Sequence, residues 1–197
     1  MKIVFATRNA GKARELRLEL EGLPITALSQ DEAGVEVNII EGGATYAANA
    51  LLKAEAVSKA TGLPALADDS GIEVEALPGE LGVLSARFGG EGLDDTGRNR
   101  LLLERLEGVA DIRRGARYVC VLAFCRAGRE AVFFEGVMSG RVLKAPRGEG
   151  GFGYDPIMYL PGRGCSVAEL DPETKNRISH RGLALAAFRE WIAANLE

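Results

Sequence analysis

Residues 1–24 read MKIVFATRNAGKARELRLELEGLP, and this opening stretch decides the class of fold. The apolar run at 2–6 has the length of a short buried strand, and a polar turn follows it. From about Gly11 to Glu21, apolar side chains recur every three or four residues, which predicts a helix with one buried face. Gly22 and Pro24 are typical helix-ending residues. The chain therefore begins with a strand, a polar turn and a helix.

Strands and helices continue to alternate along the chain. Thr45 predicts the N-cap of a second helix that runs to about Ala60. Two long strands are expected at Arg117–Cys125 and Glu130–Leu143, joined by a hairpin-like connection. The other expected elements are a short strand at 65–67, an alternating strand around Ile72 and Val74, an irregular segment at 78–92, helices at Asp94–Leu106 and Ser179–Leu196, and a capping box at Ser166–Glu169. Helices beside parallel and antiparallel strand candidates predict an α/β fold with a long mixed β-sheet, in one domain over residues 1–197.

The composition is that of an ordinary globular protein. Hydrophobic residues make up 47% and charged residues 26% of the 197 positions, and 24 basic against 28 acidic residues give a net charge of −4. An acidic balance argues against a nucleic-acid coat or a membrane-surface role, since both favour a basic face. A small anionic ligand remains compatible, because a local basic cluster can lie within an acidic protein.

The cysteines and the apolar runs bear on the compartment. Three cysteines, at 120, 125 and 165, form neither a disulfide framework nor a zinc spacing, which indicates reduced thiols. No run approaches the roughly 18 apolar residues of a membrane span, and the first apolar run is too short for a signal peptide. We therefore expect a cytoplasmic protein that does not contact a membrane.

The first polar turn is a candidate phosphate site. Its residues are Thr7, Arg8, Asn9, Ala10, Gly11 and Lys12. Backbone N–H groups at the start of a helix favour an anion, and a lysine supplies a charge suited to phosphate. The turn is not a Walker A loop, because Ala6 and Ala13 replace the required Gly and Ser/Thr. The alternative is an ordinary capped helix with a solvated lysine.

A pair of adjacent acids follows the expected short strand at 65–67. Asp68 and Asp69 precede Ser70, and neighbouring carboxylates at a strand end repel each other unless a cation compensates. Mg²⁺ commonly binds one or two carboxylates together with substrate phosphates, so the pair is a candidate metal site. Glu41 could add a second ligand. The alternatives are an Asp-rich turn and a solvated glutamate.

Two further segments carry polar or aromatic residues in suggestive positions. Asn49 and Lys53 are spaced i, i+4 and share one face of the expected second helix, which either lines a cleft or faces solvent. The loop at 148–153 matches GxGxxG literally, but a proline follows soon after and no long helix opens, which excludes a dinucleotide-binding motif. Its aromatics, Phe152 and Tyr154, either stack on a base or fill the core.

The acid after the loop and the last basic run complete the candidates. Asp155 could accept a hydrogen bond from a base N–H. The only histidine, His180, lies close to Lys175 and Arg181, and such a concentration of cations favours an anionic ligand. The alternative for His180 is a structural residue.

Taken together and in order, these segments resemble the inosine triphosphate pyrophosphatase family, whose members act on non-standard purine nucleoside triphosphates. The resemblance covers nearly the whole chain. It is carried by FATRNAGKARELR (5–17), EGGATYAANALLKA (41–54), LADDSGIEVEAL (66–77), LGVLSARFGG (81–90), GFGYDPI (151–157) and KNRISHRGLAL (175–185).

The resemblance implies a specific enzyme. It implies two lobes with a nucleotide cleft, a homodimer, Mg²⁺ dependence, and hydrolysis of ITP, dITP and XTP to the monophosphate and pyrophosphate. Asp69 would be the catalytic acid and a metal ligand, with Asp68 and Ser70 beside it. The substrate contacts implied are Thr7, Arg8, Asn9, Ala10, Gly11, Lys12, Lys53, Ser70, Phe152, Gly153, Tyr154, Asp155, Lys175, His180 and Arg181.

Two positions depart from the family pattern. Arg8 stands where a small residue is usual, so its side chain must point away or contact phosphate itself. The position of the family's metal glutamate falls on Ile40, so either the adjacent Glu41 takes the role through a small shift or the set of metal ligands differs.

Three other functions fit parts of the pattern. A nucleotide-binding regulator would keep the cations and aromatics without needing the Asp pair. A phosphotransferase would yield a nucleoside diphosphate, and the failed Walker pattern disfavours it. A pyrophosphatase for modified pyrimidines would use the same residues on another base.

Overall fold

The computed structural model describes residues 1–7, 9–39, 42–90 and 92–196, without the side chain of Ala10. The chain divides into two compact units. Unit 1 comprises Met1–Asp69, Cys120–Gly136 and His180–Glu197, and unit 2 comprises Ser70–Val119 and Val137–Ser179. Each unit is described below by itself.

The strands of the described residues form one seven-stranded sheet in the order β2-β1-β3-β4-β5-β6-β7. Their bounds are β1 (Lys2–Phe5), β2 (Thr26–Leu28), β3 (Ala65–Val74), β4 (Gly115–Cys125), β5 (Val132–Val142), β6 (Met158–Leu160) and β7 (Cys165–Ser166). Strand β1 is parallel to β2 and β3, whereas β6 is antiparallel to β5 and β7. The expected mixed sheet is therefore confirmed.

The helices lie close to their expected positions. They are α1 (Ala10–Glu19), α2 (Tyr46–Thr61), α3 (Asp95–Arg105), α4 (Pro172–Ile178) and α5 (His180–Ala194), with short 3₁₀ turns η1 (Gly82–Arg87), η2 (Asp111–Arg113), η3 (Asp155–Ile157) and η4 (Val167–Glu169). Thr45 caps α2 by accepting from the N–H of Ala48, and the capping box at Ser166 and Glu169 is present. Helix α4 was not predicted, although Asp171 caps it and Pro172 opens it in the usual way.

The prediction that the third strand ends at Ala67 is wrong. Strand β3 continues from Ala65 through Asp68 and Asp69 to Val74, so the two acids lie inside a strand rather than in a turn after it. Asp and Gly disfavour strands, but here the carboxylates have charged partners, described below. At Gly71 an added Cβ would lie 2.1 Å from the carbonyl oxygen of Gly82, so only glycine allows this backbone contact.

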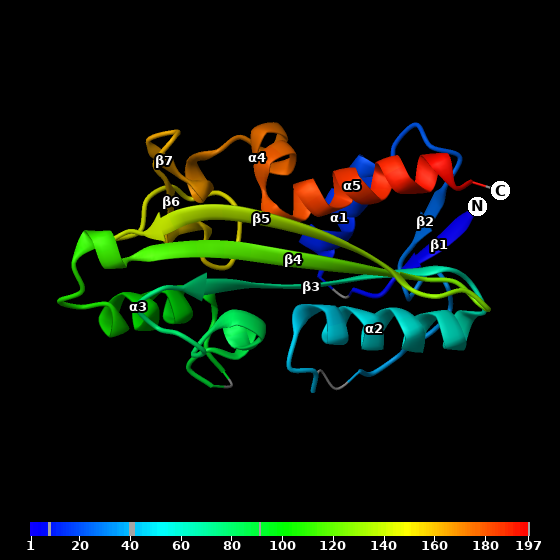
Figure 1. Cartoon of the computed structure of the whole chain (residues 1–197), viewed down its shortest axis with the longest axis horizontal. Coiled ribbons are helices and arrows are strands. Elements are labelled where there is room, and N and C mark those ends of the chain that lie inside the picture. The colour runs from blue at the N-terminus through cyan, green and yellow to red at the C-terminus, as the bar shows by residue number, and fades with distance from the viewer. Residues whose placement is uncertain (8, 40–41, 91, 197) are drawn as a thin grey trace. The chain divides into compact units, whose positions relative to one another are not determined.

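In unit 1, alternate residues of the strands pack on opposite sides, as the two-residue period of a strand requires. Ile3, Phe5 and Leu66 pack with α1 and α5, and Val4 and Ala65 pack with α2. Figure 1 shows α1 and α5 on one side of these strands and α2 on the other. Along α5, Ala184 and Phe188 are buried in this core, whereas Ala187 is exposed.

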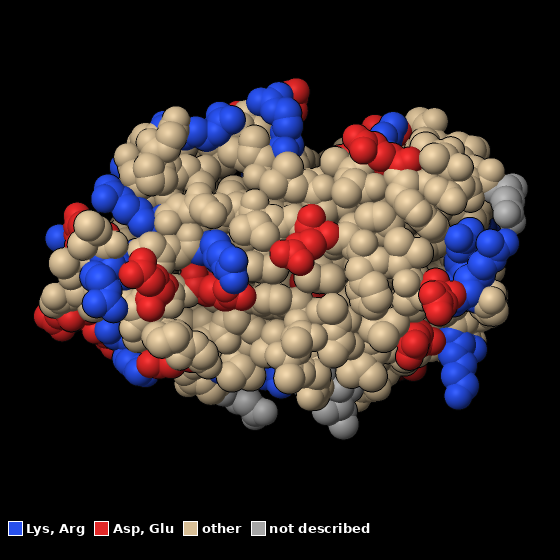
Figure 2. All heavy atoms as spheres, in the orientation of Figure 1, with Lys and Arg blue, Asp and Glu red and all other residues tan. Residues whose placement is uncertain are grey.

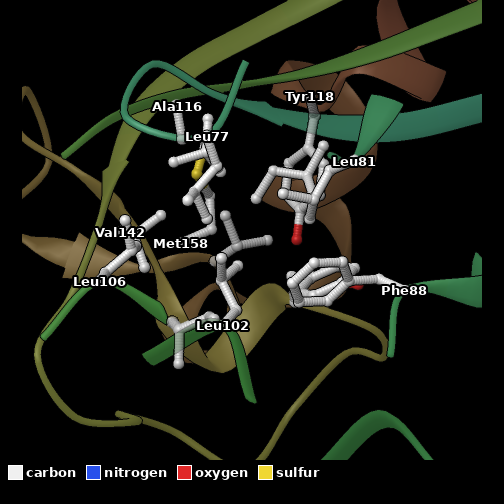
Figure 3. Close-up of a cluster of buried hydrophobic side chains, with 14 of the residues drawn as sticks. Leu77, Leu81, Phe88, Leu102, Leu106, Ala116, Tyr118, Val142 and Met158 are labelled. Atoms are coloured by element: carbon white, nitrogen blue, oxygen red, sulfur yellow. The ribbon is translucent and has the colours of Figure 1, made fainter. Parts of the chain in front are cut away.

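The core of unit 2 is a separate apolar cluster, shown in Figure 3. Leu102 and Leu106 of α3 pack there with Tyr118 of β4, Val142 of β5 and Met158 of β6. This packing fixes α3 against the strands, and α3 carries two side chains that become important below.

On the face in Figure 2, the described Lys and Arg side chains are interspersed with Asp and Glu instead of forming one basic surface. Within the described ranges, every helix is too short or too polar to cross a membrane.

Candidate functional site

Unit 1 holds a buried ion-pair cluster centred on Asp68. The Nζ of Lys12 lies 2.7 Å from Asp68 Oδ2, and Nε and Nη2 of Arg181 each donate to the same oxygen at 3.3 Å. Arg181 also donates through Nη1 to Glu15 Oε2 at 2.9 Å. The Asp68 and Arg181 side chains are 2% and 3% exposed, so water screens this cluster little. Strand β3 is thereby tied to both α1 and α5.

The charges around Asp68 decide its ionisation. Burial raises the pKa of a carboxyl group, but the positive charges of Lys12, Arg181 and Lys53 outweigh it and hold the pKa of Asp68 well below its ordinary value. Asp68 is therefore ionised at neutral pH. Burial, with the nearby charge of Asp68 added, raises the pKa of the adjacent Cys120 thiol to about 12, which fits the reduced, unreactive cysteine expected from the sequence.

Asp69 has a different set of partners, on α2. Asn49 Nδ2 donates to Asp69 Oδ2 at 3.1 Å, and Lys53 Nζ lies 3.3 Å from Asp69 Oδ1. Asn49 Oδ1 also accepts from the N–H of Gly43 at 2.8 Å, so it joins the chain before α2 to the carboxylate. Asn49 and Lys53 are buried, and the interpretation of their shared helix face as solvent-exposed is wrong.

Asp68 and Asp69 thus serve opposite sides of β3. Asp68 meets α1 and α5, whereas Asp69 meets α2, because successive side chains of a strand point to opposite faces. The adjacent acids of the sequence therefore do not converge on one point. Lys12 and Arg181 form ion pairs with Asp68, and Lys53 forms an ion pair with Asp69.

The turn before α1 is organised by its own polar side chains. Asn9 caps the helix, and its Oδ1 accepts from the N–H groups of Gly11 and Lys12 at 2.9 and 3.1 Å. Thr7 Oγ1 in turn accepts from the N–H of Asn9. Lys12 is paired with Asp68, so the alternative of a solvated lysine is wrong. An anion here would meet N–H groups that Asn9 already occupies.

Unit 2 gathers the predicted base-binding residues around Asp155. Its carboxylate accepts from Tyr118 Oη at 3.3 Å, Lys175 Nζ at 2.9 Å and the N–H of Phe152 at 3.0 Å. Burial and the charge of Asp155 raise the pKa of Tyr118, which keeps its hydroxyl as a donor. Asp155 therefore anchors the loop that contains Phe152.

The two aromatics of the loop differ in their surroundings. Tyr154 is buried, and its hydroxyl donates to the carbonyl oxygen of Ser85 at 2.7 Å, so the core-filling alternative holds for this residue. Phe152 is 37% exposed, and Lys175 Nζ lies 4.4 Å from its ring centroid. Phe152 is thus the loop aromatic with a face that a ligand could reach.

The remaining predicted residues are distributed over both units. His180 is buried at the start of α5 in unit 1, where β5 approaches so closely that a Cβ on Gly136 would lie 2.0 Å from the His180 carbonyl oxygen. Ser70 is partly buried in β3 and belongs to unit 2. Arg8, Ile40 and Glu41 lie outside the described residues.

No group of three or more His, Cys, Asp or Glu side chains in the described ranges could by itself enclose a metal ion. A metal at Asp69 would therefore need ligands from substrate, water or Glu41, a pattern that suits Mg²⁺ better than a closed structural metal site.

Several residues of these clusters were not singled out from the sequence. They are Glu15, Tyr118, Asp95 and Asn99. The last two contact Gly153 in the loop at 148–155, which is called the base loop below. Glu15 and Asn99 are 166 and 54 residues away from their partners, a distance that no local pattern spans. The i, i+4 spacing of Asp95 and Asn99 was the one available signal.

The chain is similar to known proteins over nearly its whole length. The sequence pattern of the Ham1 family matches residues 3–191. A Geobacter sulfurreducens protein named dITP/XTP pyrophosphatase is 46% identical over 97% of this chain and 96% of its own length. A Thermus thermophilus protein of the same name is 52% identical over 96% of this chain and 91% of its own. The solved structure of a HAM1 protein from Coxiella burnetii has a TM-score of 0.91 at 41% identity and covers 98% of this chain and 99% of that one.

Helices beside a seven-stranded mixed sheet define this chain as an α/β protein. Within that class, the match over nearly the whole length leaves one assignment. The chain belongs to the Ham1 family.

Proposed function

We propose that this chain hydrolyses the non-standard purine nucleoside triphosphates ITP, dITP and XTP to the monophosphate and pyrophosphate, with Mg²⁺ as cofactor. The observation that carries the proposal is full-length similarity to proteins named dITP/XTP pyrophosphatase, at 46% and 52% identity. Identity at this level over nearly the whole chain supports the same reaction here.

The unit 1 clusters suit a triphosphate only when another positive charge is present. Lys12, Lys53 and Arg181 form ion pairs with the carboxylates of Asp68, Asp69 and Glu15, so these cations are already matched by acids. A triphosphate would add further negative charge to a nearly neutral cluster. A divalent cation would offset that charge, which supports metal dependence.

Asp69 is the carboxylate that best fits Mg²⁺. Asn49 and Lys53 hold it from the α2 side, with the Asn49 amide on Oδ2 and the Lys53 ammonium on Oδ1. Asp68, by contrast, has three cationic N–H donors on its Oδ2 and faces the other side of β3. We therefore assign the metal and the proton of the attacking water to Asp69, and we keep Glu41 as a predicted second ligand. Bound Mg²⁺ would orient that water and make it more acidic.

The other residues have assigned parts in the same reaction. Thr7, Asn9 and Lys12 would bind the triphosphate, and Lys53 would offset the charge of the leaving pyrophosphate once a metal competes for Asp69. In unit 2, the exposed face of Phe152 would stack on the base. A loop that donates hydrogen bonds to a 6-keto purine rejects adenine, whose amino group presents a donor instead of an acceptor.

A substrate panel tests the function directly. Purified protein with Mg²⁺ is given ITP, dITP, XTP, the standard purine triphosphates and modified pyrimidine triphosphates, and both pyrophosphate and the nucleotide product are measured. We expect pyrophosphate and monophosphate from the first three. A diphosphate product would indicate phosphotransfer or stepwise hydrolysis, tight binding without turnover would indicate a regulator, and preference for pyrimidines would overturn the substrate class.

We also propose a homodimer, on the strength of the family resemblance. Light scattering coupled to size-exclusion chromatography should give twice the chain mass of 21.0 kDa. A monomer at micromolar concentration would contradict this assignment without affecting the proposed reaction.

A further inference from the structure

Helix α3 holds one residue of the base loop, Gly153, through both its N–H and its carbonyl group. Asp95 Oδ2 accepts from the N–H of Gly153 at 2.7 Å, and Asn99 Nδ2 donates to the carbonyl oxygen of the same residue at 3.0 Å. Asp95 and Asn99 are one helical turn apart, so they lie on one face of α3. Both bonds are within unit 2, between segments more than fifty residues apart in sequence.

We propose that Asp95 and Asn99 are positioning residues that fix Gly153 and thereby set the discrimination between bases. The pair is called the α3 clamp below. The proposal rests on the proposed function, because it assigns specificity to a loop that we expect to meet the base. Neither residue was a predicted site residue, and neither is proposed to touch substrate.

The chemistry of the clamp matches the two groups that it holds. A backbone N–H requires an acceptor, which the Asp95 carboxylate supplies, and a backbone carbonyl requires a donor, which the Asn99 amide supplies. Gly153 has φ of 64°, in the left-handed region that glycine adopts readily. Without the clamp, a glycine here has many alternative conformations, so the two bonds select one of them.

The buried amide of Asn99 also indicates a role beyond filling space. Asn99 is 6% exposed, and its Oδ1 has no hydrogen-bond partner within the described ranges. An unpaired buried acceptor is unfavourable, and an apolar side chain of similar volume would avoid that penalty. The benefit that an asparagine brings at this position is its hydrogen bond to Gly153.

The clamp acts on Phe152 and Asp155 through short connections. Gly153 directly follows Phe152, whose N–H donates to Asp155 Oδ2 at 3.0 Å. Gly151 leaves no room for a side chain, since its Cβ would lie 2.2 Å from the same oxygen. The loop is therefore held by Asp155 at Phe152 and by α3 at Gly153. Loss of the bonds to α3 would free the part of the loop next to the exposed Phe152 ring.

The test compares Asp95→Ala and Asn99→Leu with a matched control, Asp94→Ala. Asp94 caps the same helix by accepting from the N–H of Gly97 at 2.7 Å, and it makes no bond to Gly153. The Asp94 variant thus disturbs α3 without opening the clamp. The Asp95 side chain is 55% exposed, so Asp95→Ala should fold even if the buried Asn99→Leu does not.

Two readouts separate positioning from general stability. Hydrogen exchange followed by mass spectrometry should show faster exchange at the Gly153 amide in both clamp variants and wild-type exchange in the control. The ratio of kcat/KM for dITP to that for dATP should fall roughly tenfold or more in the clamp variants, since misplacing a binding group by about 1 Å has effects of this order. Hydrolysis of ribose 5-triphosphate, which has no base, should stay within about twofold of wild type, because no base contact contributes to its transition state.

Two results would overturn the clamp. One is unchanged exchange at Gly153 in Asp95→Ala. The other is an equal loss on dITP, dATP and ribose 5-triphosphate, which would mean that α3 only supports the fold. The exchange measurement needs no substrate. It therefore still judges the clamp if wild-type protein fails to hydrolyse dITP, an outcome that counts against the proposed function.

Discussion

Replacing Asp68 by asparagine should remove a large share of the stability of unit 1. The substitution keeps the shape of the side chain but leaves Lys12 and Arg181 without the negative charge that faces them at 2.7 and 3.3 Å. Breaking a buried ion pair by removing one partner is destabilising by about 3–5 kcal/mol. Arg181 retains Glu15 at 2.9 Å, and Lys12 is 19% exposed and can turn toward water. We therefore expect the lower end of this range, about 3 kcal/mol.

The assay is urea denaturation followed through Trp191, the only tryptophan of the chain. Its ring packs against Phe124 in unit 1, with centroids 5.8 Å apart, so its fluorescence reports on the unit that Asp68 stabilises. The matched control is Asp111→Asn, and because Asp111 lies in unit 2, unfolding is also followed by far-ultraviolet circular dichroism, which reports on both units. Asp111 lies 2.9 Å from Lys144, a separation close to that of the Lys12 pair, but its side chain is 56% exposed. Removing this surface pair should change the free energy of unfolding by less than about 1 kcal/mol.

The same cluster predicts the direction of the pH dependence. The pKa of Asp68 is lower in the folded protein than in the unfolded chain, where it is about 3.9. The extra stability is therefore fully present above about pH 4 and declines as the pH falls toward the folded-state pKa. The gap between wild type and Asp68→Asn should be constant from neutral pH to about pH 5 and should shrink below pH 4. A loss no larger than that of Asp111→Asn, or a gap that widens in acid, would refute the assignment of a buried, stabilising charge cluster.

Three further outcomes are expected. Asp69→Asn should lower kcat for dITP by at least about 10³-fold, measured as pyrophosphate release. Its melting temperature, measured by thermal denaturation, should fall less than that of Asp68→Asn. Arg114→Met should reduce the free energy of unfolding by about 3 kcal/mol in urea denaturation, because this buried guanidinium donates to the carbonyl oxygens of Leu106, Val142 and Leu143, which the substitution leaves unpaired. In the native protein at pH 8, a thiol reagent should label Cys165 but not Cys120 or Cys125, because burial raises the pKa of these two thiols to about 12 and about 11. The number of thiols that react is measured before and after unfolding, and the increase gives the number that the fold protects.

Local signals were sufficient for much of the fold. Thr45 and the capping box at Ser166 were predicted because a cap depends on residues within one helical turn. The long strands β4 and β5 were placed within a few residues because each gives a signal over 11 residues, a nearly continuous apolar run in β4 and an alternating pattern in β5. Short edge strands such as β2 and β7 were not predicted, since two or three residues give no periodic pattern.

The site depended on contacts that no local pattern contains. The segment Asp68–Gly71 has the composition of a turn, and it lies in a strand only because Arg181, 113 residues later, and Lys12 neutralise its first acid. The resemblance to a family identified most of the candidate residues but not their grouping. Which cation faces which acid follows from the direction of each side chain, and that direction follows from the register of β3.

The opposite orientation of two adjacent acids has a consequence for how they can work. On a strand, a carboxylate that is tied to helices on one side cannot also reach a ligand on the other. Asp68 is committed to the ion pairs that join β3 to α1 and α5, and it is ionised whatever happens at its neighbour. Asp69 contacts Asn49 and Lys53 on the α2 side of β3, so a divalent cation bound there would lie on the other side of the strand from the Asp68 cluster. If the proposed reaction is correct, the order of the two acids along β3 matters more than their number. A one-residue shift of β3 would turn each side chain to the opposite face. Asp68 would then face the metal site on the α2 side, and Asp69 would face the cations Lys12 and Arg181.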